Sequence, residues 1–345
     1  MIVVYHRNRN SFPVSQTEVL CEKSQQNLSP FSHWAQNATT VAGSANGAPG
    51  SSLSTLNGNI GIRITNDDTL YIADSDNSRI VVTRPNSTTA VAIIQNGSDS
   101  NPLFGMPGDI FITEKYIYVA DLGNSDVVRF FKNRTSPEII AGIKGQYGNS
   151  DNTSTIGFCY SIFVDKNENL YVSDFTNNRV VRYSPNSSSG TPGMIIAGNG
   201  TSGNDSSQLN SPWGIFVNEV ETLYVVDSFN HRVQIWNNGA SFGVTGAGTG
   251  VNGNSLSELS YPSAIVVDLN GYMYIVDKGN SRIVRWAPNS NTGECIAACT
   301  GITDIGIDIL HWPNALAFDS YGSLFISDGN NNRVQKFEIL DGFSE

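Results

Sequence analysis

The chain contains one pattern of about fourteen residues that occurs six times. The copy LYVSDFTNNRVVRY, Leu170 to Tyr183, shows it well. The aspartates of the six copies are Asp74, Asp121, Asp174, Asp227, Asp277 and Asp328. Successive aspartates are 47, 53, 53, 50 and 51 residues apart, and a period of about 50 residues indicates a repeat architecture. Repeats that share one core count as one domain, so the length of 345 residues does not imply two.

Each copy of the pattern predicts a β-hairpin. In LYVSD, Leu170, Val172 and Asp174 alternate with Tyr171 and Ser173, and RVVRY alternates in the same way. The four residues FTNN between the two runs form a loop rich in Asn, which tolerates turn conformations. This loop length predicts three cross-strand pairs: Asp174 with Arg179, Val172 with Val181, and Leu170 with Tyr183.

Two further apolar runs accompany each hairpin, one before it (GIFVN at Gly214) and one after it (MIIAGNG at Met194). Four short β-rich runs per unit, repeated six times, predict an all-β fold, a six-bladed β-propeller of four-stranded antiparallel blades. The last copy lacks its fourth run, and ATTVAGSANG from Ala38 matches the missing type. The N-terminal strand is therefore expected to complete the last blade. We expect residues 1–37 to be an extension that is poorly ordered or packed on the surface, residues 38–340 the propeller, and residues 341–345 a tail.

The pattern Pro-x-Gly-Ile-x-Val-Asp followed by Leu-Tyr-Val-x-Asp-x-x-Asn-x-Arg-Val resembles the NHL repeat. The segment SPWGIFVNEVETLYVVDSFNHRVQIW, Ser211 to Trp236, matches best, with Asn230, His231 and Arg232 in the central part of the signature. The resemblance covers residues 38 to 340 and implies a six-bladed propeller. For function it implies several classes, because NHL domains occur as protein-binding and RNA-binding modules, in extracellular sensor regions and in an amidating lyase.

The repeated Asp and Arg side chains are expected to be structural pairs that fix each hairpin. Their members are Asp74 with Arg79, Asp174 with Arg179, Asp227 with Arg232, Asp277 with Arg282, and Asp328 with Arg333. The second copy differs, because Asp126 stands where the arginine should be and faces Asp121. Two opposed carboxylates are unfavourable unless a positive charge intervenes. We expect Arg129 or a neighbouring blade to supply it, and a bound cation such as calcium is the alternative.

Charge and composition bear on partners and location. The formal net charge is -11, with 20 Lys and Arg residues, of which five are expected to be held by the motif aspartates. This balance argues against nucleic acid as a partner and disfavours the RNA-binding alternative. No apolar run approaches the length of a membrane span, and the start MIVVYHRNRNSF is no recognisable signal peptide. Nine Asn-x-Ser/Thr sequons lie outside the repeated strand pattern, and this placement favours an extracellular glycoprotein. We also expect a monomer.

The four cysteines allow two disulfides, with three alternative pairings. Cys295 and Cys299 lie close together in ECIAACTG. If that segment is one straight strand, their Cα atoms are about 13 Å apart, which is beyond disulfide reach. Free buried thiols are the alternative to disulfides, and the pairing of Cys21, Cys159, Cys295 and Cys299 is left open.

The histidines do not provide an obvious catalytic metal site. The chain has four, at His6, His33, His231 and His311, and His231 occupies a turn position that is Ser or Asn in other copies. The lyases of the NHL family use several histidines around zinc, and lactonase-like propellers hold calcium with Glu and Asn. Neither set can be located here, so we assign no catalytic residue, metal ligand or cofactor. A metal-dependent enzyme centred on the channel, amidating-lyase-like or lactonase-like, remains the alternative function.

The loops that enter each first strand carry large apolar side chains. They are expected to converge around the central opening, and their candidate binding residues are Met106, Tyr160, Trp213, Tyr261 and Trp312. Aromatic residues on a rigid, loop-rich face are typical of recognition surfaces. The alternative is that these rings fill gaps between the blades. The sequence therefore predicts a non-catalytic recognition scaffold that binds a protein, peptide or glycan through this rim.

Overall fold

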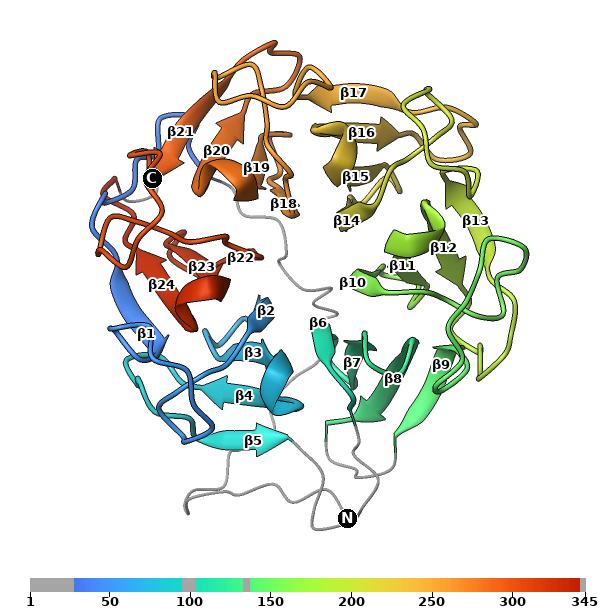
Figure 1. The fold of residues 1–345 in the computed structure, drawn as a ribbon, viewed down its shortest axis with the longest axis horizontal. Coiled ribbons are helices and arrows are strands. Elements are labelled where there is room, and N and C mark those ends of the chain that lie inside the picture. Colours follow the sequence, from blue (N-terminus) through green and yellow to red (C-terminus); the bar gives the residue numbers. More distant parts are fainter. Residues whose placement is uncertain (1–27, 95–103, 133–136, 342–345) are drawn as a thin grey trace, which may run out of the picture.

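Six four-stranded antiparallel sheets surround a central axis, each as one blade of a propeller (Figure 1). The computed structural model describes residues 28–94, 104–132 and 137–341. The described residues form strands, turns and five single-turn 3-10 helices, with no α-helix among them. The predicted fold class is confirmed.

The strands follow the repeat in chain order, with the first strand of each blade nearest the axis. The first and second blades contain β2 (Asn59–Ile64), β3 (Leu70–Asp74), β4 (Arg79–Thr83), β5 (Ala92–Ile94), β6 (Pro107–Ile112), β7 (Tyr116–Asp121), β8 (Asp126–Phe131) and β9 (Glu138–Gly142). The third and fourth contain β10 (Cys159–Val164), β11 (Leu170–Asp174), β12 (Arg179–Tyr183), β13 (Met194–Ala197), β14 (Pro212–Val217), β15 (Leu223–Asp227), β16 (Arg232–Trp236) and β17 (Val244–Ala247). The fifth and sixth contain β18 (Ala264–Val267), β19 (Met273–Asp277), β20 (Arg282–Trp286), β21 (Gly293–Ala297), β22 (Leu316–Phe318), β23 (Leu324–Asp328), β24 (Arg333–Phe337) and β1 (Thr39–Gly43).

The repeated pattern forms the two middle strands of each blade, in the predicted register. In the third blade Asp174 pairs with Arg179, Val172 with Val181, and Leu170 with Tyr183. The connecting loop is one turn of 3-10 helix followed by a residue in the left-handed conformation, as at Asn178 with φ 53°. The five such turns are η1 (Ser75–Asn77), η2 (Phe175–Asn177), η3 (Ser228–Asn230), η4 (Lys278–Asn280) and η5 (Gly329–Asn331).

The motif side chains fasten each hairpin to the loop that enters its blade. Asp174 is fully buried and accepts hydrogen bonds from Arg179 Nε (2.9 Å), Asn177 Nδ2 (2.9 Å) and the backbone N–H of Gly157 (2.8 Å). The remaining Arg179 nitrogens donate to backbone carbonyls of the preceding loop, including that of Asn152 at 2.6 Å. All five predicted Asp–Arg pairs form, with Nε–Oδ2 distances of 2.5 to 2.9 Å.

The second blade has no such pair. Asp126 pairs with Asp121 across the hairpin, and both side chains are fully buried. Of the expected sources of positive charge, Arg129 supplies none, because its guanidinium donates to Glu138 (3.0 Å) and to the carbonyl of Pro185 (2.9 Å). Side chains at alternate positions of a strand point to opposite faces, and Arg129 is three positions from Asp126. Burial and the charge of Asp121 raise the pKa of Asp126 to about 7. The charge of Lys144, in the segment that leads from β9 to the third blade, does act on Asp126 and opposes this rise in pKa.

The N-terminal strand closes the ring, as predicted. β1 pairs antiparallel with β24, from Thr39 opposite Lys336 to Gly43 opposite Arg333. The first and last blades are also joined by Asn59, whose side-chain amide donates to Ser327 Oγ at 2.6 Å. Just before β1, the indole of Trp34 is buried and donates to the carbonyl of Gly322 at 2.9 Å.

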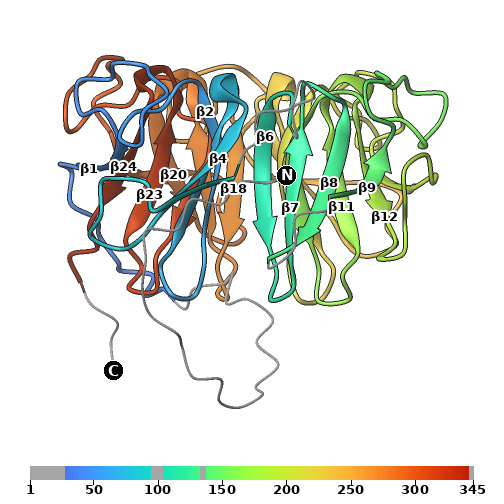
Figure 2. The same ribbon diagram turned by 90° about the horizontal axis from the view of Figure 1, so that it is seen from below.

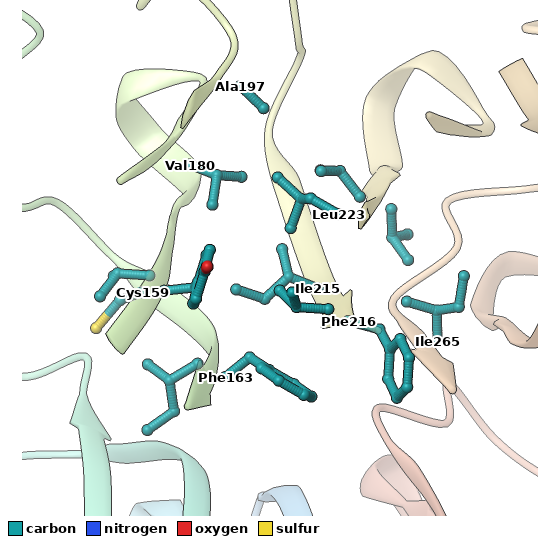
Figure 3. Close-up of a cluster of buried hydrophobic side chains, with 14 of the residues drawn as sticks. Cys159, Phe163, Val180, Ala197, Ile215, Phe216, Leu223 and Ile265 are labelled. Carbon is teal, nitrogen blue, oxygen red and sulfur yellow. The ribbon is translucent and has the colours of Figure 1, made fainter. Parts of the chain in front are cut away.

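The core lies between neighbouring blades rather than within one sheet. Figure 3 shows it around the third and fourth blades, where Phe163 and Phe216 lie beside Ile215 and Leu223. Both faces of each sheet are therefore covered by side chains, which explains why the strands are apolar on both faces. Truncating a buried Phe such as Phe216 to Ala would cost about 3 to 5 kcal/mol of unfolding free energy.

One expectation for the cysteines is wrong. Cys295 and Cys299 form a disulfide, with their Cα atoms 5.8 Å apart. The segment is not a straight strand, because β21 ends at Ala297 and Ala298 turns the chain with φ 53°. Cys159 is a buried free thiol, and Cys21 lies outside the described residues.

Candidate functional site

The loops that enter the inner strands lie at one end of the ring. Figure 2 shows that β6 begins at the upper end and β7 returns to it, so the 3-10 turns that follow the second strands lie on the same face. We call this end the loop face. The sequence therefore brings two kinds of loop together there: the loops before the inner strands and the motif turns.

Aromatic rings form a continuous surface on the loop face across the third, fourth and fifth blades. Tyr160 and Trp213, from β10 and β14, stack with ring centroids 4.2 Å apart and an interplanar angle of 29°. Phe175 of η2 packs edge-on against both rings, at 4.9 Å from Tyr160 and 5.7 Å from Trp213. The aromatic surface, as we name it, consists of Tyr147, Phe158, Tyr160, Phe175, Trp213, Phe229 and Tyr261.

The outer part of this surface is open to solvent. Phe229 of η3 is 48% exposed and contacts both Phe175 (5.9 Å) and Tyr261 (5.6 Å). Tyr261 is 39% exposed, and its backbone N–H donates to Nδ1 of His231 at 3.1 Å. Burial lowers the pKa of His231 below its ordinary value, so the neutral ring that accepts this bond is favoured. The two exposed rings are thus held in place by their neighbours.

A buried lysine extends the aromatic surface towards the sixth blade. The ammonium of Lys278 in η4 lies 4.1 Å from the ring centroid of Trp213 and 5.5 Å from that of Trp312. It donates to the side-chain oxygen of Asn314 at 2.6 Å. Lys278 is 8% exposed, and burial lowers its pKa to about 8. Trp312 is 47% exposed, so its indole faces solvent beside a largely protonated amine.

Two of these rings have backbone conformations that bulky residues rarely adopt. Tyr261 has φ 43° and Trp312 has φ 51°, both in the left-handed region. Each lies directly before the proline that begins the blade, and the same position is Gly58 in the first blade and Ser211 in the fourth. A left-handed conformation costs a bulky residue on the order of 1 kcal/mol or more. The fold alone would accept a glycine at either position.

The central channel begins beneath this surface. A cavity of about 100 Å³ is lined by inner-strand residues of all six blades, including Tyr160, Trp213 and Asn314. Asp109 on the channel wall accepts hydrogen bonds from the backbone N–H groups of Ile110 (2.8 Å) and Ile162 (3.0 Å). Burial raises its pKa to about 6, against the opposing effects of these bonds and of Arg63. Asp109 therefore joins the second blade to the third.

The wider channel wall is largely apolar. Phe111, Phe163 and Phe216 occupy equivalent positions on successive inner strands, with centroid distances of 5.0 and 5.4 Å. The guanidinium of Arg63 lies 4.0 Å from the centroid of Phe111. Within the described part of the chain, no group of three or more His, Cys, Asp or Glu side chains could hold a metal ion.

The predicted rim residues are only partly brought together. Tyr160 and Trp213 touch, Tyr261 is joined to them through Phe229 and Phe175, and Trp312 through Lys278. Met106 lies at the start of the second blade, 39% exposed, and its backbone N–H donates to Asp121 at 2.9 Å. Tyr261 and Trp312 are 39% and 47% exposed, so these two rings do not simply fill gaps between the blades.

Sequence analysis missed three residues of this site. Phe175, Phe229 and Lys278 lie in the variable positions just after the motif aspartate, in DFTN, DSFN and DKGN. All six copies share the Asp and the Asn, and five share the Arg, so the shared positions mark the structural network. The sequence signal that could have identified these three residues is their variation between copies. The fold does not fix the residue type at such positions, so they are available for binding.

Comparison with known proteins identifies the fold. No protein-family model and no curated protein sequence matches this chain. Among solved structures, a protein of unknown function from Bacteroides thetaiotaomicron is 17% identical with a TM-score of 0.67, and the match covers 88% of this chain and 76% of that one. An auxiliary nutrient binding protein from the same species is 13% identical with a TM-score of 0.63, covering 90% and 77%. Virginiamycin B lyase from Staphylococcus aureus is 12% identical with a TM-score of 0.55, covering 88% and 98%.

The class that these findings define is the six-bladed β-propeller. At such low identities the likeness concerns the fold, which binding proteins and enzymes share. Function must therefore be argued from the loop face and the channel. No helix in the described residues is long and apolar enough to cross a membrane.

Proposed function

We propose that this chain is an NHL-type propeller that acts outside the cell as a non-catalytic recognition scaffold. Its loop face binds a protein, peptide or glycan, as a monomer and without a cofactor. The observation that carries the proposal is the aromatic surface, whose outer rings Phe229 and Tyr261 are 48% and 39% exposed while their inner neighbours fix their positions. Rigid exposed rings lose little conformational entropy on binding, which is why they dominate recognition surfaces.

The strained backbone at Tyr261 and Trp312 supports this proposal. Both rings stand where Gly58 stands in the first blade, and neither is buried. Since strained conformations cluster at functional sites, their presence here favours a binding role. One of the neighbours in fold is a nutrient binding protein, which is consistent with a scaffold of this kind.

The proposal is tested by screening the purified protein against arrays of glycans and peptides. The variant Phe229→Ser removes an exposed ring of the aromatic surface, and Tyr321→Ser serves as the control. Tyr321 is 68% exposed in the turn between β22 and β23, at the opposite end of the blades. A hit that F229S weakens about tenfold or more and Y321S leaves unchanged supports the loop face. Equal binding by F229S and the parent protein to every hit would refute it.

A channel-centred enzyme is the second candidate, and one observation favours it. Asp109 on the channel wall has a pKa raised to about 6, which suits a general acid or base near neutral pH. Its hydrogen bonds to two backbone N–H groups already give it a structural role. Turnover of a lactone that Asp109→Asn abolishes and F229S leaves unchanged would favour the enzyme over the scaffold.

A further inference from the structure

The charge of Lys278 is unusual among the buried cations of the described chain. The five motif arginines each contact a buried aspartate, and Arg285 contacts Glu294 at 2.7 Å. Lys278 contacts two indoles and the neutral amide of Asn314, and burial lowers its pKa to about 8. A buried charge without a counter-charge destabilises the folded state, although cation–π contacts offset part of that.

The fold does not require a lysine at this position. The residues that follow the motif aspartate in the other five copies are Ser75, Leu122, Phe175, Ser228 and Gly329. None of them carries a charge, and their turns have the same 3-10 geometry in the four copies that form one. The lysine is therefore an addition to one blade, and it sits where the aromatic surface meets the channel cavity through Trp213 and Asn314.

The surroundings of the ammonium define what can approach it. One face of Trp213 is stacked on Tyr160 and its ring also contacts Lys278, whereas Trp312 is 47% exposed. A ligand that neutralises the ammonium would therefore lie beside the ring of Trp312. One ammonium beside one exposed indole suits one anionic group rather than a run of them.

Resting on the proposed function, we infer that the loop face recognises an acidic sugar, whose anionic group pairs with Lys278 while its ring packs on Trp312. A sugar ring offers an apolar C–H face to the exposed indole of Trp312, while its anionic group reaches the ammonium of Lys278. A peptide would use other features: strand edges, helix grooves or proline-binding grooves. The strands end at the loop face, so they present no edge there (Figure 2). A carboxylate or a sulfate could supply the negative charge, so the test includes an oligosaccharide of each kind.

Calorimetry with four probes tests the inference: oligogalacturonate, a sulfated galactan oligosaccharide, the matching neutral galactan and a Glu-rich peptide. We expect one acidic oligosaccharide to bind at least about tenfold more tightly than neutral galactan, with affinity falling as salt rises. Lys278→Met keeps an apolar stem and removes the charge, so it should abolish this preference. The control Lys166→Met alters an exposed lysine, whose ammonium contacts the carbonyl of Glu219, and should not.

The melting temperature distinguishes a binding role from a structural one. K278M removes an uncompensated buried charge, so its unliganded melting temperature should equal or exceed that of the parent protein. A lower melting temperature with unchanged sugar binding would overturn the inference and show that Lys278 supports the fold. Failure of both acidic oligosaccharides to bind the parent protein, or preference for the Glu-rich peptide, would also overturn it. If F229S weakens an array hit that K278M does not, the loop-face proposal stands and the acidic-sugar inference fails.

Discussion

Replacing Asp126 by Asn should stabilise the protein at neutral and alkaline pH and change little in mild acid. Asp126 is fully buried, faces Asp121, and has no hydrogen-bond partner for either carboxylate oxygen among the described residues. Asp121, in contrast, accepts bonds from the backbone N–H groups of Gly105 and Gly123 and from Asn124 Nδ2 at 2.7 Å. Asp126 is therefore the member of the pair that keeps a proton.

The magnitude follows from the pKa of Asp126, which burial and the charge of Asp121 raise from 3.8 to about 7. The folded state holds a proton that the unfolded chain releases above about pH 4, so stability falls as pH rises from about 4 to about 7. Each pH unit in this window is worth about 1.4 kcal/mol, which amounts to about 3 kcal/mol between about pH 5 and pH 7. Asn does not titrate, so the variant does not lose this unfolding free energy as the pH rises.

Urea unfolding at about pH 5 and about pH 8 measures the difference, with Asp76→Asn as control because Asp76 is an exposed carboxylate of η1. The unfolding free energy of D126N relative to that of the parent protein should rise by about 3 kcal/mol from about pH 5 to about pH 8. The unfolding free energy of D76N should change with pH as that of the parent protein does. If the unfolding free energies of D126N and the parent protein differ by the same amount at both pH values, the buried proton does not belong to Asp126.

Three further predictions concern the ring and its fastenings. Deleting the chain through Gly43 leaves β24 with an open edge, so calorimetry should show a lower melting temperature and size-exclusion chromatography aggregation; an unchanged melting temperature would contradict closure by β1. Arg179→Lys should cost about 3 kcal/mol or more of unfolding free energy, since one ammonium cannot replace the contacts to Asp174 and to three carbonyls, whereas Arg84→Lys on the exposed surface should cost almost nothing. Millimolar calcium should leave the melting temperature unchanged if Asp126 is protonated; a rise that D126N abolishes would point to a cation instead.

The architecture could be predicted from the sequence because five of the six blades repeat the same buried Asp–Asn–Arg network. Asp174, Asn177 and Arg179 must occur at fixed spacing for the hairpin to hold its entering loop, so the spacing gives the register. The disulfide could not be predicted, since it depends on the chain turning at Ala298, where no glycine or proline marks the turn.

The candidate site was predictable only in outline. Tyr160 and Trp213 begin inner strands, so their convergence follows from ring geometry. Phe229 and Lys278 lie in turns whose identity the fold leaves open, and their contacts cross from one blade to the next. Such contacts depend on side-chain packing between units, which the pattern of a single repeat does not contain.

Fluorine NMR of protein labelled with fluorotryptophan tests ligand binding at the loop face most directly. Of the five tryptophans, Trp213 and Trp312 lie at this site, whereas the other three, Trp34, Trp236 and Trp286, are buried elsewhere in the blades. On titration with a bound oligosaccharide, the account predicts shifts at Trp213 and Trp312 alone. Resonances of these two indoles that stay unmoved at saturating ligand would contradict it.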